Sequence, residues 1–472
     1  MAAASRQVAG QEQDDDRLGR LPNDILVSIL KHLDDLRDAV RCSILSKQWR
    51  HLPGMLPIID LDVWSFLKHY DTFEATVPRR NLGLVRAVES VLSRHRRQRT
   101  TIDRLAIHFF LTGDDDPGRI VRAVDAAVTS GDRRISSAGL SMFGEKLDVH
   151  CVEGDIMLRH ATRLLSLLGA YPAAFACLTD LHLESVRLLD GSDVPRLLRA
   201  CGKLERLSLI NCDSGLRAVL PLEHPRLREL RADFCACEAV HLRWLPRLRR
   251  VACGRWMHSE SLPPFLFGHV PELAAVEFSN AAAVGYIRDL RLSELVGDAA
   301  TTIRELVLNF ENQRVWIQPE KPVPVMHNLT LASFHNIRKQ CDLTWTMLIL
   351  KSAPHLKTLG VTVSDHVCEG VDPDVARQFF SEKDNIQWQP SDFKHRSLSM
   401  LVIEGYEVQD KFMKYIKRVM EVAVNLQDVR LRRNECKGCN FYQTGFPQTS
   451  KEKDSTRRQI NDGRSAAIKV TF

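Results

Sequence analysis

The residues most suggestive of chemistry are two cysteines near the C-terminus, Cys436-Lys-Gly-Cys439. Two cysteines at this spacing form half of a typical zinc site, which uses four ligands. No Cys or His follows Cys439. The upstream candidates stand at no ligand-like spacing: Cys341, His366, Cys368 and His395. We interpret the pair as structural, with zinc as the alternative, and expect no bound metal.

Catalytic motifs are absent from the sequence. It contains no G-x-x-x-x-G-K-S/T loop, no G-x-S-x-G elbow, no H-E-x-x-H and no G-x-G-x-x-G. His182-Leu-Glu184 matches part of a deaminase signature, but no P-C-x-x-C follows it. We therefore expect no catalytic residues, no cofactor and no enzymatic activity of the chain itself.

Positive charge is concentrated in residues 226–255, which contain eight arginines and only three acidic residues, a local net charge of +5. The favoured interpretation is that these arginines flank strands and loops in solvent. The alternative is a surface for an acidic partner, a phosphorylated peptide or an inositol phosphate. Nucleic acid is not expected, because no aromatic residues alternate with the arginines to stack on bases. The candidate patch consists of Arg228, Arg231, Arg249, Arg250 and Arg255.

The overall composition is that of an ordinary globular protein, with 472 residues, 44% hydrophobic and 26% charged. The 65 basic and 59 acidic residues give a net charge of +6, which is too small for a chain that binds mainly polyanions. The N-terminus lacks the apolar core of a signal peptide. The longest uncharged stretch, residues 164–179, contains Pro172 and is too short to span a bilayer. We expect a cytoplasmic or nuclear protein, or both, that does not bind membranes.

Residues 1–16 are small or polar and are expected to form a flexible tail. After them, the elements that would position any site follow two sequence patterns. The first pattern predicts three short amphipathic helices. Apolar spacing places five residues on one stripe of the first helix: Ile25, Leu26, Ile29, Leu30 and Leu33. The second helix carries Ala39, Val40 and Ile44. The third begins near Ser46, carries Trp49 and Leu52, and should end at Pro53-Gly54. A unit this small exposes apolar surface that it cannot bury alone, so a partner is implied.

The second pattern is a repeat that runs from about residue 101: apolar, two residues, apolar, one residue, apolar. Its best copies start at Leu204, Leu227 and Leu426, and other copies start at Ile102, Leu248, Leu273, Ile303, Met326, Leu356 and Leu398, with weaker ones at Ile135 and Leu178. This irregular L-x-x-L-x-L period is the leucine-rich-repeat signature. The L-x-L core predicts a short strand, and neighbouring repeats must stack because none covers its apolar face alone. Cys235 fills the loop position of one copy, so Cys235-Ala-Cys237 is interpreted as structural.

Residues 17–60 resemble the F-box of plant leucine-rich-repeat proteins. The resemblance rests on Leu21-Pro22-Asn23-Asp24-Ile25-Leu26 and on Leu45-Ser46-Lys47-Gln48-Trp49-Arg50 at the expected distance. Two positions depart from the family: Asn23, where a second acid is more usual, and Gln48, where Lys or Arg is usual. Both are predicted to face solvent. The tail resembles an FBD region, through Cys436-Lys-Gly-Cys439, Gly445-Phe446-Pro447, Gln459-Ile-Asn-Asp-Gly463 and Ile468-Lys-Val-Thr-Phe472.

The predicted architecture is therefore α/β: a small three-helix F-box followed by a leucine-rich-repeat solenoid. The predicted segments are an F-box at 17–60, a linker at 61–100, repeats at 101–394, and an FBD-like region with the last repeats at 395–472.

The resemblance implies that the F-box binds a Skp-type adaptor, which in turn binds a cullin-RING scaffold. It also implies that the repeats select a protein substrate for ubiquitin transfer. Two alternatives remain: an interaction scaffold whose partner is not degraded, and, supported only by the arginines, a small-molecule co-receptor. The expected adaptor-binding residues are Leu21, Pro22, Ile25, Leu26, Ile29, Leu30, Leu33, Val40, Ile44, Leu45 and Trp49.

Overall fold

The computed structural model describes residues 20–33, 36–66, 73–98, 101–130, 135–145, 154–215, 218–256, 262–279, 290–311, 317–318, 324–364, 393–435, 443, 445–463 and 467–472. The predicted tail at 1–16, Cys436 and Cys439 lie outside these residues. Two compact units divide the chain, Met1–Ser141 and Met142–Phe472. Each unit is described by itself.

The first unit begins with the three predicted helices, α1 (Asn23–Leu30), α2 (Leu36–Arg41) and η2 (Trp49–Met55), with a short 3₁₀ turn η1 (Cys42–Ile44) after α2. Pro22 occupies the N-cap of α1. Ser46, near which the third helix was expected to begin, lies before a turn at residues 47–48: its Oγ accepts a hydrogen bond from the Trp49 N–H at 3.4 Å, but the N-cap of η2 is Gln48 and not Ser46. The third helix continues past Pro53-Gly54 to Met55, because it is a 3₁₀ helix that accommodates the proline.

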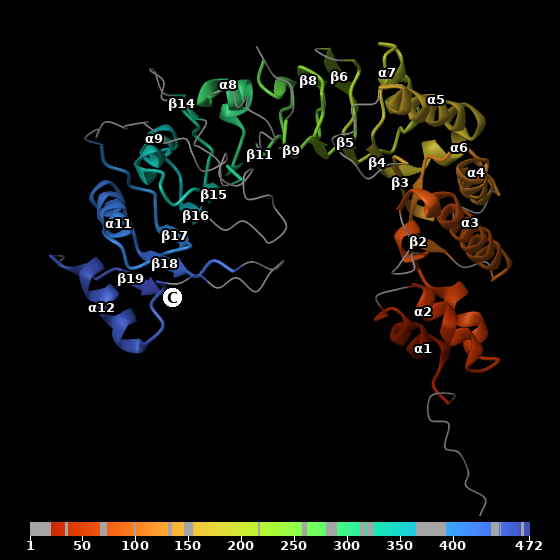
Figure 1. Ribbon diagram of the computed structural model, residues 1–472, viewed down its shortest axis with the longest axis horizontal. Helices are drawn as coiled ribbons and strands as arrows, with labels where there is room; N and C mark the ends of the chain where they lie inside the picture. The colour runs from red at the N-terminus through yellow and green to blue at the C-terminus, as the bar shows by residue number, and fades with distance from the viewer. Residues whose placement is uncertain are drawn as a thin grey trace, which may run out of the picture. The chain divides into compact units, whose positions relative to one another are not determined.

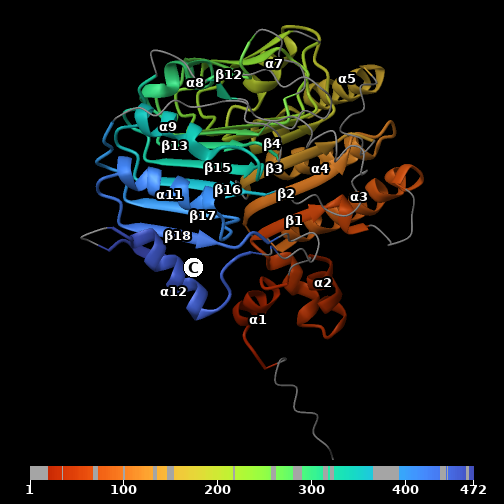
Figure 2. The ribbon, with the colours of Figure 1, turned by 60° about the vertical axis from the view of Figure 1, so that its left-hand side comes forward.

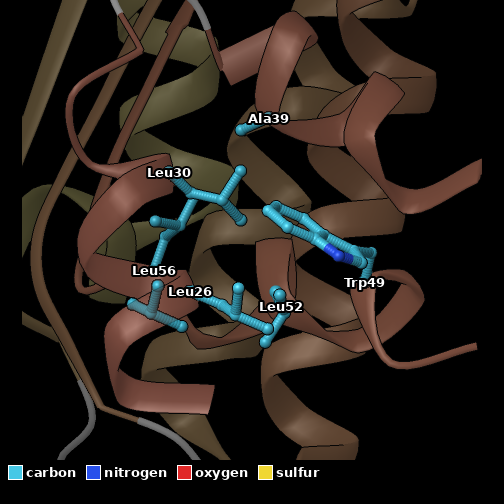
Figure 3. Close-up of a cluster of buried hydrophobic side chains, with 7 residues drawn as sticks. Leu26, Leu30, Ala39, Trp49, Leu52 and Leu56 are labelled. Carbon is cyan, nitrogen blue, oxygen red and sulfur yellow. The ribbon is translucent and has the colours of Figure 1, made fainter. Parts of the chain in front are cut away.

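Seven buried residues form the core of these helices: Leu26, Val27, Leu30, Ala39, Trp49, Leu52 and Leu56 (Figure 3). Leu21, Cys42 and Met55 pack against it and are partly buried.

The rest of the first unit contains β1 (Ile58–Asp62), η3 (Val63–Phe66), α3 (Phe73–Gln98), β2 (Ile102–Phe110), α4 (Asp116–Thr129) and the start of β3 (Ile135–Phe143). β1 pairs with β2 in parallel. Most of residues 61–100, predicted as a linker, therefore lie in regular structure. Helix α3 buries Leu84, Val85 and Val88 at one-turn spacing and contacts α4 and β2.

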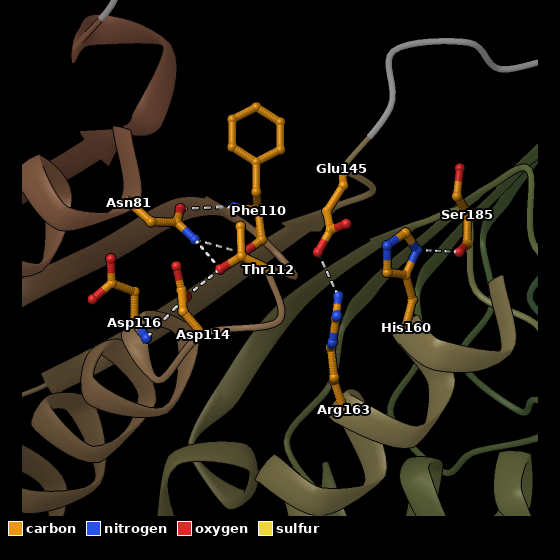
Figure 4. A network of polar contacts seen from close by, with 9 residues as sticks. All are labelled: Asn81, Phe110, Thr112, Asp114, Asp116, Glu145, His160, Arg163 and Ser185. Atoms are coloured by element: carbon orange, nitrogen blue, oxygen red, sulfur yellow. Dashed lines mark hydrogen bonds and ion pairs between the residues drawn. The ribbon is translucent and has the colours of Figure 1, made fainter. Parts of the chain in front are cut away.

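Buried Asn81 joins α3 to the end of β2 (Figure 4). Its Nδ2 donates to the Phe110 carbonyl at 2.8 Å and to the Thr112 Oγ1 at 2.9 Å, while its Oδ1 accepts from the Phe110 N–H at 3.1 Å. A buried amide with both ends satisfied fixes the helix against the strand, since losing either contact would leave a buried polar group unpaired.

The second unit is a stack of parallel strands, as the repeats predict (Figures 1 and 2). In sheet order these are β4 (Leu178–Glu184), β5 (Arg206–Ile210), β7 (Glu229–Asp233), β9 (Arg250–Gly254), β11 (Ala275–Ser279), β13 (Glu305–Asn309), β15 (Leu331–Ile337), β16 (Thr358–Val363), β17 (Met400–Glu404), β18 (Asp428–Arg432) and β19 (Lys469–Thr471). A smaller parallel sheet is made by β6 (Val219–Glu223), β8 (Ala239–Trp244) and β10 (Phe265–His269), and two short strands, β12 (Leu290–Arg291) and β14 (Ile317–Gln318), pair with each other.

Helices and 3₁₀ turns connect these strands. They are α5 (Gly154–Ala170), α6 (Pro172–Ala176), α7 (Asp193–Ala200), α8 (Leu292–Val296), η4 (Gly297–Thr301), η5 (Leu343–Thr346), α9 (Met347–Ser352), α11 (Asp410–Val422) and α12 (Ser450–Asn461).

The register confirms the repeat pattern. Leu207 of β5 lies opposite Leu230 of β7, and Leu209 lies opposite Ala232, and all four are buried. Several strands are followed by a residue with positive φ, where the chain turns out of the sheet: Ser185, Asn211, Phe234 and Arg255. Cys235 is buried in such a loop, and its Sγ contacts the Leu209 and Asp233 carbonyls, in line with the structural role predicted for it.

Two buried histidines tie loops of neighbouring repeats together. The Nε2 of His224 lies 3.1 Å from the Cys201 carbonyl oxygen, and its Nδ1 accepts a hydrogen bond from the Arg226 N–H at 3.2 Å. His395 repeats the arrangement with the Ala353 carbonyl at 2.9 Å and the Leu398 N–H at 3.0 Å. Because a carbonyl only accepts and a backbone N–H only donates, both rings are held neutral, with the proton on Nε2. Burial also lowers the pKa of both histidines.

The C-terminal residues add a strand to the sheet. β19 pairs with β18, and Thr449 begins α12 through a capping box with Glu452. The guanidinium of Arg457 lies over the Phe472 ring, 5.1 Å from its centroid. The FBD-like tail therefore adds a strand to the repeat stack.

Candidate protein-interaction surfaces

The structure divides the expected adaptor-binding residues into a core set and an exposed set. Leu26, Leu30 and Trp49 are at most 5% exposed and belong to the core. The exposed set consists of Ile25, Ile29, Leu33, Ile44 and Leu45, which are 46, 39, 38, 85 and 63% exposed. Pro22 is exposed and Leu21 is half-buried against the core, while the side chain of Val40 lies outside the described part.

The exposed set has the character of an unpartnered interface. Ile25 and Ile29 stand one turn apart on α1, and Leu33 continues the same spacing just beyond the helix. Ile44 and Leu45 lie at the end of η1. Single exposed apolar residues are normal, but five within about 20 residues of a unit this small make its surface unusually apolar. We name Ile25, Ile29, Leu33, Ile44 and Leu45 the F-box face.

The two positions that depart from the F-box pattern contact each other. The Nε2 of Gln48 donates to the Asn23 Oδ1 at 3.1 Å and to the Leu21 carbonyl at 3.0 Å. Asn23 is exposed, as predicted, but Gln48 is only partly so. The two departures are therefore coupled. Asn23 and Gln48 form a neutral amide pair between the start of α1 and the residue before η2, at positions where the acid and the base usual in the family would form an ion pair.

The arginine patch is largely neutralised by its own protein. Arg228 pairs with Glu205 at 3.7 Å, Arg231 with Asp233 at 2.6 Å, Arg249 with Glu272 at 3.1 Å, Arg250 with Glu305 at 3.0 Å and Arg255 with Glu311 at 3.1 Å. All five predicted patch residues thus have a carboxylate within ion-pair distance. This supports the interpretation of these five as solvated strand flanks and weakens the case for an anion site built from them.

Part of this pairing is a charge ladder across the sheet. The register places Asp180, Arg206, Glu229 and Arg250 side by side on β4, β5, β7 and β9, with alternating sign. Arg206 also forms an ion pair with Asp180. Opposite charges at facing positions of neighbouring strands stabilise a sheet and fix its register.

The deaminase-like fragment shows no catalytic arrangement. The His182 ring makes an edge contact with Phe143, with 5.5 Å between centroids. Burial raises the pKa of Glu184 to about 7. Among the described residues, no three His, Cys, Asp or Glu side chains are grouped so that they could hold a metal.

In the described ranges, no helix combines the length and apolar character needed to cross a bilayer.

Comparison with known families agrees with this division of the chain. The F-box-like family matches residues 18–52. The family described as FBD-associated F-box protein At5g56370, LRR repeats, matches residues 158–361. The chain therefore combines an F-box-like domain with FBD-associated leucine-rich repeats.

The relatives are plant proteins of the same architecture. The chain is 26% identical to F-box/FBD/LRR-repeat protein At5g56420 of Arabidopsis thaliana, over 60% of this chain and 67% of the relative. It is 23% identical to F-box/FBD/LRR-repeat protein At1g51370 of the same plant, over 73% and 74% of the two chains. A short match, 43% identical over 11% of this chain and 12% of the relative, links it to F-box/FBD/LRR-repeat protein At5g53840, also from Arabidopsis thaliana. This architecture is that of a substrate adaptor, and an F-box generally binds a Skp-type adaptor.

Proposed function

We propose that this protein is the substrate-recognition subunit of an SCF-type cullin-RING ubiquitin ligase. The F-box face would dock on the Skp-type adaptor, and the repeats would bind a protein substrate in the cytoplasm or nucleus. In this role the chain performs no chemistry. We retain the proposed division into an F-box at 17–60, a connecting segment at 61–100, repeats at 101–394 and an FBD-like region with the last repeats at 395–472. Helix α3 adds a folded element to the connecting segment.

The observation that carries the proposal is the F-box face. Its residues remain exposed although the same group of helices already contains a core of seven buried residues. A core that is already closed does not need these five side chains, so their apolar character is explained best by a partner. The repeats supply the second half of the argument, because a stacked solenoid offers a long surface for protein recognition.

The test is co-elution of the intact chain with a Skp-type adaptor in size-exclusion chromatography. Ile25→Ser/Ile29→Ser should abolish co-elution and leave the far-UV circular dichroism unchanged. The matched control is Val325→Ser/Val408→Ser, which alters two residues with similar exposure, 48 and 53%, outside the F-box. Deleting residues 1–60 is a poorer test, because the cut falls inside β1.

Wild-type co-elution that survives in the Ile25/Ile29 variant would place the adaptor contact elsewhere and refute the assigned face. Absence of binding by the wild-type chain would favour the alternative, an interaction scaffold whose partner is not degraded.

A further inference from the structure

Three basic side chains of the second unit are left without an acidic partner in the region where the other arginines are paired. Six of the eight arginines in residues 226–255 form ion pairs, the sixth being Arg243 with Glu223 at 3.6 Å. Across the described ranges, no carboxylate lies within 4.0 Å of the charged groups of Arg226 and Arg247, or of nearby Lys203, and all three residues are exposed.

These three residues occupy the same turn in three consecutive repeats. The Arg228 N–H donates to the Glu205 carbonyl and the Arg249 N–H to the Arg228 carbonyl, both at 2.8 Å. This ladder puts 205, 228 and 249 in one column. Lys203, Arg226 and Arg247 each precede their column residue by two positions. They therefore form a row, which we name the turn row, with about 5 Å between adjacent chain segments.

Within the described part of these repeats, each carboxylate beside the turn row is already paired. Glu205, Glu223 and Glu272 lie in the same turns or at the strand end before them, and each is already paired with an arginine. These three pairs are neutral, so the row keeps a local net charge of +3. Glu272 holds the equivalent position in the following repeat and ends the row. Like charges held this close repel one another, which is relieved when an anion binds.

An exposed tryptophan adjoins the turn row. Trp244 ends β8, three residues before Arg247, and is 47% exposed. The register places it beside Glu223 of β6, three residues before Arg226. β6 and β8 lie next to each other, in the same part of the second unit as β5 and β9 (Figure 1). Tryptophan and arginine are the residues most enriched where protein partners bind tightly.

We propose that the turn row with Trp244 binds an acidic peptide segment of a protein partner. An extended peptide with acids at alternate positions spaces its carboxylates by about 6.8 Å, within reach of three long basic side chains about 5 Å apart. An apolar residue between the acids would contact Trp244. A single aromatic residue does not make the stacking platform that single-stranded nucleic acid requires, which favours a peptide. This surface differs from the arginine patch predicted from sequence, and binding there does not depend on the adaptor.

The test is fluorescence polarisation of the intact chain with a labelled peptide of about ten residues, in which Asp or Glu alternates with Leu. A peptide with Asn and Gln in place of the acids is the negative probe. The variant is Lys203→Glu/Arg226→Glu/Arg247→Glu. Its matched control is Lys351→Glu/Lys414→Glu/Lys417→Glu, three exposed lysines on α9 and α11 with the same change in net charge.

The expected result is binding of the acidic probe alone, weakened at least tenfold in the turn-row variant and less than twofold in the control. Trp244→Ala, made in the wild-type chain, should weaken binding of the acidic probe threefold or more. Raising the salt concentration from 50 to 300 mM should also weaken this binding, because salt screens exposed charges. Equal losses in both triple variants would overturn the proposal by showing a net-charge effect. Tighter binding of heparin or of single-stranded DNA than of the peptide would also overturn it, in favour of a general polyanion site. Unchanged adaptor co-elution of the turn-row variant separates this test from that of the proposed function.

Discussion

The exposed pair Ile44 and Leu45 offers the most quantitative prediction. These residues keep 85% and 63% of their surface exposed, the largest fractions in the F-box face. Fully burying an Ile or Leu side chain contributes about 1.5–3 kcal/mol, so an adaptor that covers both would gain roughly 2–4 kcal/mol from them. Replacing both by Ala should remove about 2 kcal/mol of binding free energy, a roughly thirtyfold increase in Kd.

The assay is calorimetric titration of a Skp-type adaptor into the intact Ile44→Ala/Leu45→Ala variant. The free energy of unfolding should change by less than about 0.5 kcal/mol, since both side chains are on the surface. The control is Leu189→Ala/Val424→Ala, which trims two residues that are 55% and 49% exposed outside the F-box. A Kd of the Ile44/Leu45 variant within threefold of wild type would refute the reasoning, and so would an equal loss in the control. By contrast, Leu30→Ala opens the core and should cost about 2–5 kcal/mol of stability, so it cannot separate binding from folding.

Three further predictions concern stability. Gln48→Ala removes two hydrogen bonds to the start of α1 and should destabilise the F-box helices by about 1–2 kcal/mol, seen as faster amide hydrogen exchange in α1. Glu229→Lys places a third cation between its two flanking arginines in the charge ladder and should lower the free energy of unfolding by about 1 kcal/mol, measured by urea denaturation. Burial lowers the pKa of His224 and His395, so their stabilising contribution is full above about pH 6.5 and is lost as pH falls through their depressed pKa values. Thermal unfolding between pH 7 and 5 should therefore show a smaller loss of stability in His224→Gln/His395→Gln than in wild type.

Each of these stability predictions has a contradicting outcome. Unchanged exchange rates in α1 of Gln48→Ala would mean that the amide pair does not hold the helix. Glu229→Gln serves as the control for the ladder, and equal destabilisation by Gln and Lys would attribute the effect to lost packing. Identical pH profiles of wild type and the double histidine variant would show that other groups dominate. Glu184, whose pKa is raised to about 7, changes stability in the opposite sense as pH falls, which is why only the difference between the two proteins is informative.

The repeats could be predicted from sequence because their signal is local. Leu207 and Leu209 are two residues apart, so both face the core wherever the strand lies in the stack, and the register shows them buried opposite Leu230 and Ala232. The same holds for Cys235, whose place in the repeat predicted a buried loop position.

The division of the F-box residues could not be predicted in this way. Ile25, Leu26, Ile29 and Leu30 are four apolar residues on one wide helical stripe, and only the packing of η2 decides that Leu26 and Leu30 face inward. Sequence distance also hid the partners of the arginines. Arg250 of β9 pairs with Glu305 of β13, which is 55 residues away in the sequence. The strand between them, β11, carries the small Ala275 at the facing position, so the two long side chains meet over it.

Helix α3 lies inside the segment predicted as a linker, and that prediction overlooked an apolar spacing. Leu84, Val88 and Val91 recur at helical intervals and are buried, which a search for periodicity in this segment could have found.

We propose that the F-box joins this protein to a ubiquitin ligase through an adaptor. The most direct measurement is size-exclusion chromatography of the intact chain with a cullin-RING scaffold, with and without the Skp-type adaptor. The chain should elute with the scaffold only when the adaptor is present, and Ile25→Ser/Ile29→Ser should eliminate this complex. Elution apart from the scaffold in the presence of adaptor, or together with it in the absence of adaptor, would contradict the account.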